Sequence, residues 1–193
     1  MPRSAPLVLA LVAVAVTACT TGTPTPAATS PSAATTPSAA TTGQTDVPLS
    51  VAALREAPCT GLTADQAAGF DLAPGKAISD VGYGPSCMWT SPQYDSNVVT
   101  LSFHDLGGDG LDHLRANRAD HAYHDEVEIG GYPAIIASSF DLRSEGDCGL
   151  WVGVADGLAA SVGAAFKQGR DAADPCSGAR RVAAAIVDKL KRT

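Results

Sequence analysis

Four cysteines in the second part of the chain carry the clearest chemical signal. Cys59, Cys87, Cys148 and Cys176 form an even-numbered set, and in an exported domain such a set indicates two disulfide bonds. Four cysteines allow three pairings. We favour Cys59–Cys87 and Cys148–Cys176, because both pairs are separated by the same 28 positions and each would join a helix start to a nearby strand. Zinc is the weaker alternative, because the sequence contains no CxxC pair.

A fifth cysteine, Cys19, ends an apolar segment. Leu7 to Val16 contains only Leu, Val and Ala, and at about 1.5 Å per residue it covers roughly half of a hydrocarbon core of about 30 Å. A positive charge before the segment and small residues after it are typical of a secretory signal peptide. Val16-Thr17-Ala18-Cys19 resembles the lipobox of bacterial lipoproteins, in which the cysteine thiol receives a diacylglycerol. A conventional signal peptide whose cleavage site lies beside a cysteine is the alternative.

The residues after Cys19 cannot build a core. The stretch 20–47 contains no aromatic residue, no Leu or Ile and a single charge, at Asp46, so it cannot bury enough apolar surface to offset the entropy of ordering. We therefore expect a signal peptide over residues 1–18, a disordered, lipid-anchored tether over 19–47 and one folded domain over 48–193. The domain is long enough for a substantial hydrophobic core.

The charge balance limits the partners. The formal net charge is −7 at pH 7, whereas nucleic-acid binding is favoured by a basic surface. An acidic domain is also not expected to lie flat on an anionic membrane. The sequence thus predicts attachment to the extracytoplasmic face of the cell membrane through the N-terminal lipid, and no binding of nucleic acid.

Histidines and serines are the remaining residues with catalytic or metal-binding chemistry. His113, His121 and His124 lie beside aspartates, and a continuous helix would place His121 and His124 on one face as a metal pair. We expect that helix to end near His121, and we predict no metal site. The calcium loop faintly suggested by residues 105–112 lacks the EF-hand spacing and its closing Glu.

No motif assigns catalysis to the serines. The candidates are Ser138, Ser139, Ser144 and Ser161, none of which lies in a GxSxG elbow or an SxxK motif. A dispersed catalytic triad is the alternative, because the three residues of such a triad can lie far apart in the sequence and meet only in the folded protein. No phosphate loop or dinucleotide fingerprint occurs, so we expect no cofactor and a non-catalytic protein.

The aromatic residues suggest core packing and surface contact. Trp89 and Trp151 each follow a cysteine by two or three positions, so we expect both to pack against the disulfides, with the wall of a ligand groove as the alternative. We place Tyr83, Tyr94 and Tyr123 in loops, available for exposed contacts.

The elements that position these residues follow from pattern and capping. Helices are predicted over 63–69, where Thr63 and Gln66 form a capping box, over 111–121 with Asp109 as the cap, and over 177–191 after Asp174 and Pro175. Strands are predicted over 87–90, 97–104, 127–137 (two strands about Gly130-Gly131), 148–155 and 158–166. Because hairpins predominate, we predict an α+β fold, a mainly antiparallel sheet packed with helices and stabilised by two disulfides.

Several segments together resemble a known family. The stretches APCTGLTADQAAGF, GPSCMWT, VEIGGYPAIIA, DCGLWVGVADG and DPCSGARRVAAAIVDKL resemble, in this order, the actinobacterial lipoprotein family of domain of unknown function 3558. The resemblance implies an exported, lipid-anchored, disulfide-bearing α+β domain and no known reaction. We therefore expect a non-catalytic cell-surface lipoprotein that binds a small molecule or lipid, an envelope component or a partner protein. The alternatives are a cell-envelope hydrolase and a structural subunit of a membrane complex.

Overall fold

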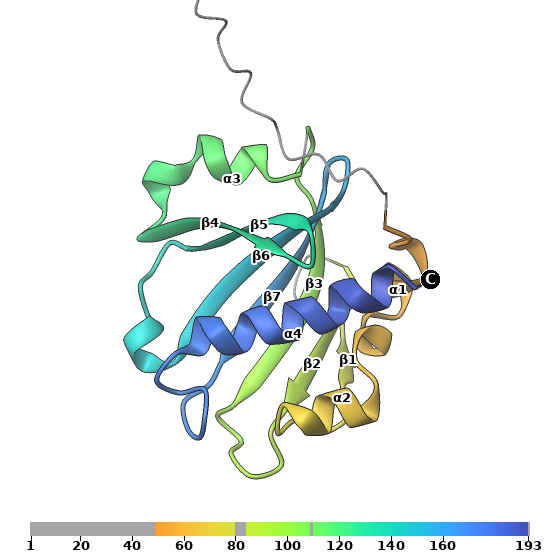
Figure 1. Cartoon of the computed structure of the whole chain (residues 1–193), viewed down its shortest axis with the longest axis vertical. Coiled ribbons are helices and arrows are strands. Elements are labelled where there is room, and N and C mark those ends of the chain that lie inside the picture. Colours follow the sequence, from red (N-terminus) through yellow and green to blue (C-terminus); the bar gives the residue numbers. More distant parts are fainter. Residues whose placement is uncertain (1–48, 80–83, 109, 193) are drawn as a thin grey trace, which may run out of the picture. The chain divides into compact units, whose positions relative to one another are not determined.

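A seven-stranded antiparallel sheet organises the part of the chain that the computed structural model describes, residues 49–79, 84–108 and 110–192. All of these residues lie within one unit, 40–193. The sheet order is β1-β2-β3-β7-β6-β5-β4 (Figure 1). The strands are β1 (Lys76–Ile78), β2 (Ser86–Thr90), β3 (Val98–Asp105), β4 (Tyr123–Ile129), β5 (Tyr132–Ser138), β6 (Asp147–Ala155) and β7 (Leu158–Ala165).

Short helices and one long helix complete the fold. The α-helices are α1 (Ala52–Glu56), α2 (Ala64–Gly69), α3 (Asp112–Ala116) and α4 (Pro175–Leu190), and the 3₁₀ turns are η1 (Pro58–Gly61), η2 (Arg118–Asp120) and η3 (Arg143–Glu145). None of the helices in the described residues is long and apolar enough to cross a membrane. The predicted α+β class, with a mainly antiparallel sheet, is confirmed.

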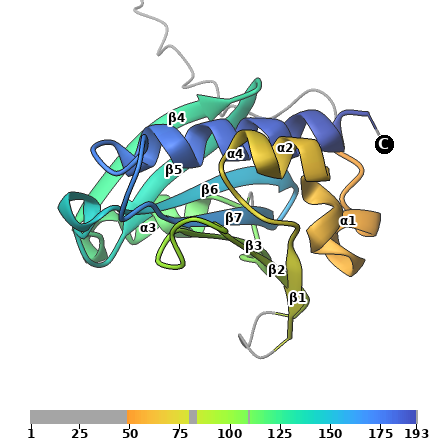
Figure 2. The same ribbon diagram turned by 90° about the horizontal axis from the view of Figure 1, so that it is seen from below.

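The core lies between one face of the sheet and α4. Figure 2 shows α4, together with α1 and α2, along the same side of the sheet. Side chains alternate between the two faces of a strand. Along β6 and β7 the even-numbered residues therefore turn toward α4. The buried residues between this face and α4 include Leu101, Leu150, Val152 and Val162 of the sheet and Val182 and Ile186 of α4.

The helix starts follow the predicted capping. Thr63 Oγ1 accepts a hydrogen bond from the backbone N–H of Gln66 (3.2 Å), and Gln66 Oε1 accepts one from the N–H of Thr63 (2.9 Å). Asp174 caps α4 by accepting from the N–H of Ser177 (2.9 Å), and Pro175 occupies the first turn. Both helices therefore begin where their sequences satisfy otherwise unpaired N–H groups.

Both disulfides lie on the α4 side and have the predicted pairing. Cys59 in η1 is joined to Cys87 in β2, and Cys148 in β6 is joined to Cys176 in the first turn of α4. Each bond connects a helical turn to a strand.

Some local predictions were wrong or lie elsewhere. The helix expected over 111–121 ends at Ala116, and Leu111 stands at its N-cap position without a side-chain cap. β4 begins at Tyr123 rather than at Val127, because pairing with β5 continues to Tyr123 opposite Ser138. The signal peptide, the tether with Cys19, Tyr83 and Asp109 lie outside the described residues.

Candidate functional site

The face of the sheet opposite α4 is only partly covered. Buried Leu111 and Leu114, from the α3 region, pack on Ile135, Ala137 and Ala159 and form a small second core. These strand residues alternate with those that face α4, so α3 lies on the opposite face. Elsewhere on that face the central strands carry mainly small or polar residues, together with the large side chain of Trp151.

Two adjoining cavities lie on this open face. One has a volume of about 280 Å³ and reaches the end of β5, and the other has about 320 Å³ and is lined by Leu114, His121, Trp151 and Ser161. Both are lined by Thr100, Ser138, Gly149 and Gly163. We call the combined feature the open-face groove. Its size approaches that of small-molecule sites, which span roughly 300–1,000 Å³.

Glycines form the floor of the open-face groove. Thr100, Gly163 and Gly149 lie in register on β3, β7 and β6 and therefore form a row across the sheet. A methyl group added at Gly163 would lie 2.7 Å from Thr100 Oγ1, and one at Gly149 would lie 2.7 Å from the carbonyl oxygen of Ala137. The missing side chains give the groove its depth.

The sheet separates at one end of the groove. The pairing of β5 with β6 stops at Ile136 opposite Leu150, although β4 and β5 remain paired as far as Tyr123. The backbone N–H of Gly149 instead donates to the hydroxyl oxygen of Tyr123, at 3.1 Å. Tyr123 is 8% exposed. The expectation of an exposed loop tyrosine was therefore wrong, because this hydroxyl substitutes for a ladder partner.

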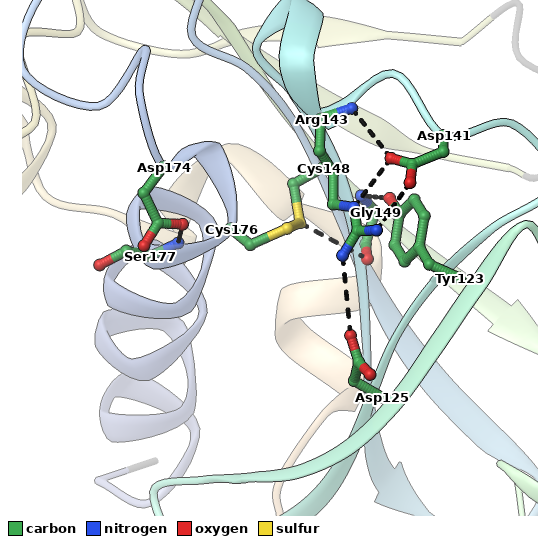
Figure 3. The surroundings of a disulfide bond; sticks show 9 residues. All are labelled: Tyr123, Asp125, Asp141, Arg143, Cys148, Gly149, Asp174, Cys176 and Ser177. Atoms are coloured by element: carbon green, nitrogen blue, oxygen red, sulfur yellow. Dashed lines mark hydrogen bonds and ion pairs between the residues drawn. A yellow bond between two sulfur atoms is a disulfide. The ribbon is translucent and has the colours of Figure 1, made fainter.

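Charged side chains hold Tyr123 in place. Figure 3 shows Arg143 against the Tyr123 ring, near the Cys148–Cys176 bond, with the guanidinium carbon 4.3 Å from the ring centroid. Asp141 accepts two hydrogen bonds from the Arg143 side chain, at 2.8 and 2.6 Å, and one from its backbone N–H, at 3.3 Å. These bonds lower the pKa of the Asp141 carboxyl to about 2, so the pair is ionised throughout the physiological range.

Exposed apolar side chains border the same end. Phe140 is 72% exposed and Leu142 is 39% exposed, and they are the exposed large hydrophobic residues of the described part. Both line the smaller cavity. The only charged residue that lines it in the described part is Asp147, which pairs with Lys167. The rim is therefore apolar and the nearest charge is compensated.

A polar pair lies deeper on the open face. His104 Nε2 is 2.9 Å from Ser161 Oγ, and the ring of His104 meets the edge of Trp151 with centroids 4.8 Å apart. Burial lowers the pKa of His104, so its imidazole is neutral at pH 7. Ser161 lies in the middle of β7, opposite both Ser102 and Trp151. Because the backbone there is engaged in sheet pairing, it offers no evident set of free N–H donors for an oxyanion.

The two tryptophans have different roles. Trp89, two positions after Cys87, is fully buried on the α4 side, and a methyl group at Gly75 would touch both Cys87 Sγ and Trp89 Nε1. Its predicted packing on a disulfide is confirmed. Trp151 follows Cys148 by three positions and so faces the other way, into the open-face groove. Its predicted disulfide packing was wrong, and the groove-wall alternative fits the structure.

His121 and His124 meet without a helix. His121 ends η2 and His124 lies in β4, and their Nδ1 atoms are 3.2 Å apart. Within residues 49–79, 84–108 and 110–192 there is no group of three His, Cys, Asp or Glu side chains placed to hold a metal ion. The exposed His113, on α3, accepts a hydrogen bond at its backbone oxygen from the side chain of Asn117 at the C-cap, and it does not join the pair.

Other sequence candidates are spread over the surface. Ser138, Ser139 and Ser161 line the groove, whereas Ser144 lines a separate polar depression near α4. Tyr94 lies half-buried in the β2–β3 loop near Gly169. The sequence reasoning missed Gly149 and Gly163. Their signal was present, because small residues occupy every second position of 159–165.

The comparison with known families gives one match. Residues 14–189 match the family described as protein of unknown function (DUF3558). The chain belongs to this family. The match covers all of the strands and both disulfides. Neither the curated proteins nor the solved structures contain a match to this DUF3558 protein, so its function has to be argued from the groove.

Proposed function

We propose that this DUF3558 protein is a non-catalytic, lipid-anchored protein of the extracytoplasmic membrane face, and that its open-face groove binds the apolar chain of a small envelope amphiphile. The observation that carries the proposal is the continuity of two cavities over a glycine floor, bordered by Phe140 and Leu142. The groove crosses from β3 through β7 and β6 to β5, roughly 14 Å at about 4.8 Å per strand spacing. That length suits an extended acyl chain.

The chemistry of the walls supports an uncharged apolar ligand. Described lining residues are mostly small, apolar or hydroxyl-bearing, and Asp147 is already paired with Lys167. A ligand carboxylate would find no unpaired cation among these lining residues. An apolar chain would cover Phe140 and Trp151, each of which contributes through the area removed from water.

The two tryptophans make a direct binding test possible. The chain contains only Trp89 and Trp151, so 5-fluorotryptophan labelling gives two ¹⁹F signals. We expect the methyl ester of 5-doxylstearic acid, a neutral paramagnetic probe, to broaden the Trp151 signal of the full-length protein. Trp89, on the opposite face, reports non-specific contact. Equal broadening of both signals would contradict groove binding.

A groove-filling variant with a matched control sharpens the test. Gly163→Val places methyl groups on the groove floor and should weaken probe binding about tenfold, which corresponds to roughly 1.4 kcal/mol. Gly69→Val adds the same side chain where a Cβ meets nothing within 4 Å, and it should bind the probe normally. Unchanged binding by folded Gly163→Val would exclude the groove as the site.

Membrane anchoring needs its own experiment. The lipobox-like Val16-Thr17-Ala18-Cys19 supports acylation at Cys19. We expect the wild-type protein to partition into detergent and its N-terminal peptide to carry the mass of a diacylglycerol. Cys19→Ala should abolish the lipid modification. A Cys19→Ala protein that stays equally membrane-bound would contradict the anchor.

An envelope hydrolase is the second candidate, because His104 and Ser161 are hydrogen-bonded beside the groove. If it were correct, Ser161→Ala would abolish turnover in an esterase, peptidase, glycosidase and phosphatase screen. We expect no turnover in the wild-type protein.

A further inference from the structure

A histidine pair forms part of the groove wall. His121 lines the larger cavity, and His124 is opposite Ala137, which lines it as well. The Nδ1 atoms of the two histidines are 3.2 Å apart, and their nearly parallel rings have centroids separated by 5.4 Å. His124 is 7% exposed, and its Nε2 has no hydrogen-bond partner among the described residues. The position of His121 is therefore set by a contact with a buried imidazole.

The contact depends on the number of protons in the pair. A hydrogen bond between two Nδ1 atoms requires a proton on one of them and a lone pair on the other. If both imidazoles are charged, both Nδ1 atoms are donors, and two positive rings then face each other at this separation. The bond can therefore exist with one imidazolium at most. This follows from the geometry of the pair.

The neighbouring charges act in the same sense. Burial lowers the pKa of His124 most strongly, and the charges of Arg118 and His121 lower it further. Glu126 and Asp125 raise it less. Both carboxylates have cationic partners, since Arg115 Nε is 3.3 Å from Glu126 Oε2 and Arg143 lies 3.9 Å from Asp125.

The remaining elements around the pair add little opposing charge. On β5, Ala137 is the residue paired with His124, and it does not titrate. On α3, Asp112 is bound to Arg115 at 3.0 Å. The surroundings therefore favour the state in which His124 is neutral.

We propose that the His121–His124 pair is an acid-sensitive wall of the open-face groove, which loses its hydrogen bond when both imidazoles are protonated and then weakens ligand binding. The effect on ligand rests on the proposed function, whereas the loss of the hydrogen bond does not. The pKa of His124 lies below the ordinary value of 6.5. The hydrogen bond between the two imidazoles is therefore present above pH 6.5 and is lost as the pH falls through the lowered pKa of His124.

The titration of the pair can be followed without any ligand. The chain has four histidines, so ¹⁵N imidazole spectra of the full-length protein, recorded with a chelator from pH 7.5 to 4.5, resolve each one. We expect His124 to take up its proton only below pH 6.5, because burial lowers its pKa, and the ¹⁵N signals of the two Nδ1 atoms to lose their hydrogen-bonded shifts in the same range. Nδ1 signals that keep their hydrogen-bonded shifts after His124 has taken up its proton would overturn the proposal.

The ligand arm uses the neutral methyl ester of 5-doxylstearic acid, which does not titrate itself. If binding requires the pair to hold one proton fewer, affinity should fall by up to about tenfold per pH unit below the pKa of the pair. His121→Asn keeps an amide donor for His124 Nδ1 but cannot become a cation, so its binding should be independent of pH. His113→Gln is the matched control and should behave as the wild type.

The two arms separate the possible failures. Loss of the Nδ1–Nδ1 hydrogen bond on acidification together with a probe that never reaches Trp151 would contradict the proposed function and leave the proton-dependent contact standing. Probe binding with the same pH dependence in His121→Asn as in the wild type would contradict the acid-sensitive wall alone.

Discussion

The two faces of the sheet are built from the same strands but differ in how they are filled. The α4 face carries large buried residues such as Leu101, Leu150 and Ile186, and both disulfides lie on it. The open face carries Gly149, Gly163 and hydroxyl-bearing residues, and α3 covers only its β4–β5 side. One set of strands thus supports a close-packed core and a hollow at the same time.

The difference separates stability from binding. Burial of apolar area provides the main favourable contribution to folding, and the α4 face holds most of it. Two covalent bonds connect that face to η1 and α4. The opposite face can therefore contain a groove and exposed Phe140 without loss of the fold. Changes on the α4 face should accordingly lower mainly stability, and changes on the open face should lower mainly binding.

A large effect is expected from loss of a disulfide on the α4 face. The double variant Cys148→Ala/Cys176→Ala opens a loop of 28 positions and should lower the free energy of unfolding by about 3–4 kcal/mol in the chain-entropy model. Urea unfolding measures this change, and Cys59→Ala/Cys87→Ala provides the matched second disulfide. A loss below about 1 kcal/mol would mean that the stability of the α4 face does not depend on this bond.

A pair of single substitutions compares the faces directly. Ile186→Ala removes a fully buried side chain of α4 and should cost about 2–5 kcal/mol. Phe140→Ala, at the rim of the groove, should change stability by about 0.5 kcal/mol or less and should weaken binding of the doxyl probe. Equal destabilisation by both variants would remove the distinction between the faces.

A smaller loss of stability is expected where β5 separates from β6. Tyr123→Phe removes the oxygen that accepts from the Gly149 N–H and should cost about 1–3 kcal/mol, the range for leaving a buried donor unpaired. Tyr94→Phe, in the half-buried β2–β3 loop, is the control and should be nearly neutral. If Tyr123→Phe is also neutral, water from the groove replaces the hydroxyl.

The smallest effect concerns the charges beside the rim. The Asp141 carboxyl should titrate near its pKa of about 2, because Arg143 donates hydrogen bonds to it. Its folded pKa lies below the ordinary 3.8, so the ion pair is present above that pH and is lost as the pH falls through about 2. Carboxyl ¹³C shifts measure this, and Arg143→Gln should return the midpoint toward 3.8. An unshifted Asp141 in the wild type would contradict the pairing.

Short sequence patterns predicted much of the structure on the α4 face. The capping box at Thr63, the Asp174-Pro175 start of α4 and the equal spacing of the cysteines all act over short stretches or by a simple count. Their outcomes were confirmed because satisfying helix N–H groups and oxidising paired thiols depend little on distant residues. The hairpin at Gly130-Gly131 was predicted for the same reason, since both residues adopt positive φ.

The groove needed the tertiary structure. The alternation of small residues along 159–165 is visible in the sequence, but their alignment with Thr100 and Gly149 depends on the register of β7 with β3 and β6. Likewise, a three-residue offset from Cys148 placed Trp151 on the groove side, and the end of β5–β6 pairing drew Tyr123 inward. Sequence alone predicted the fold class, the cysteine pairs and the starts of α2 and α4, because those signals depend little on distant residues. Strand register, which joins residues more than 60 positions apart, decided where the groove lies.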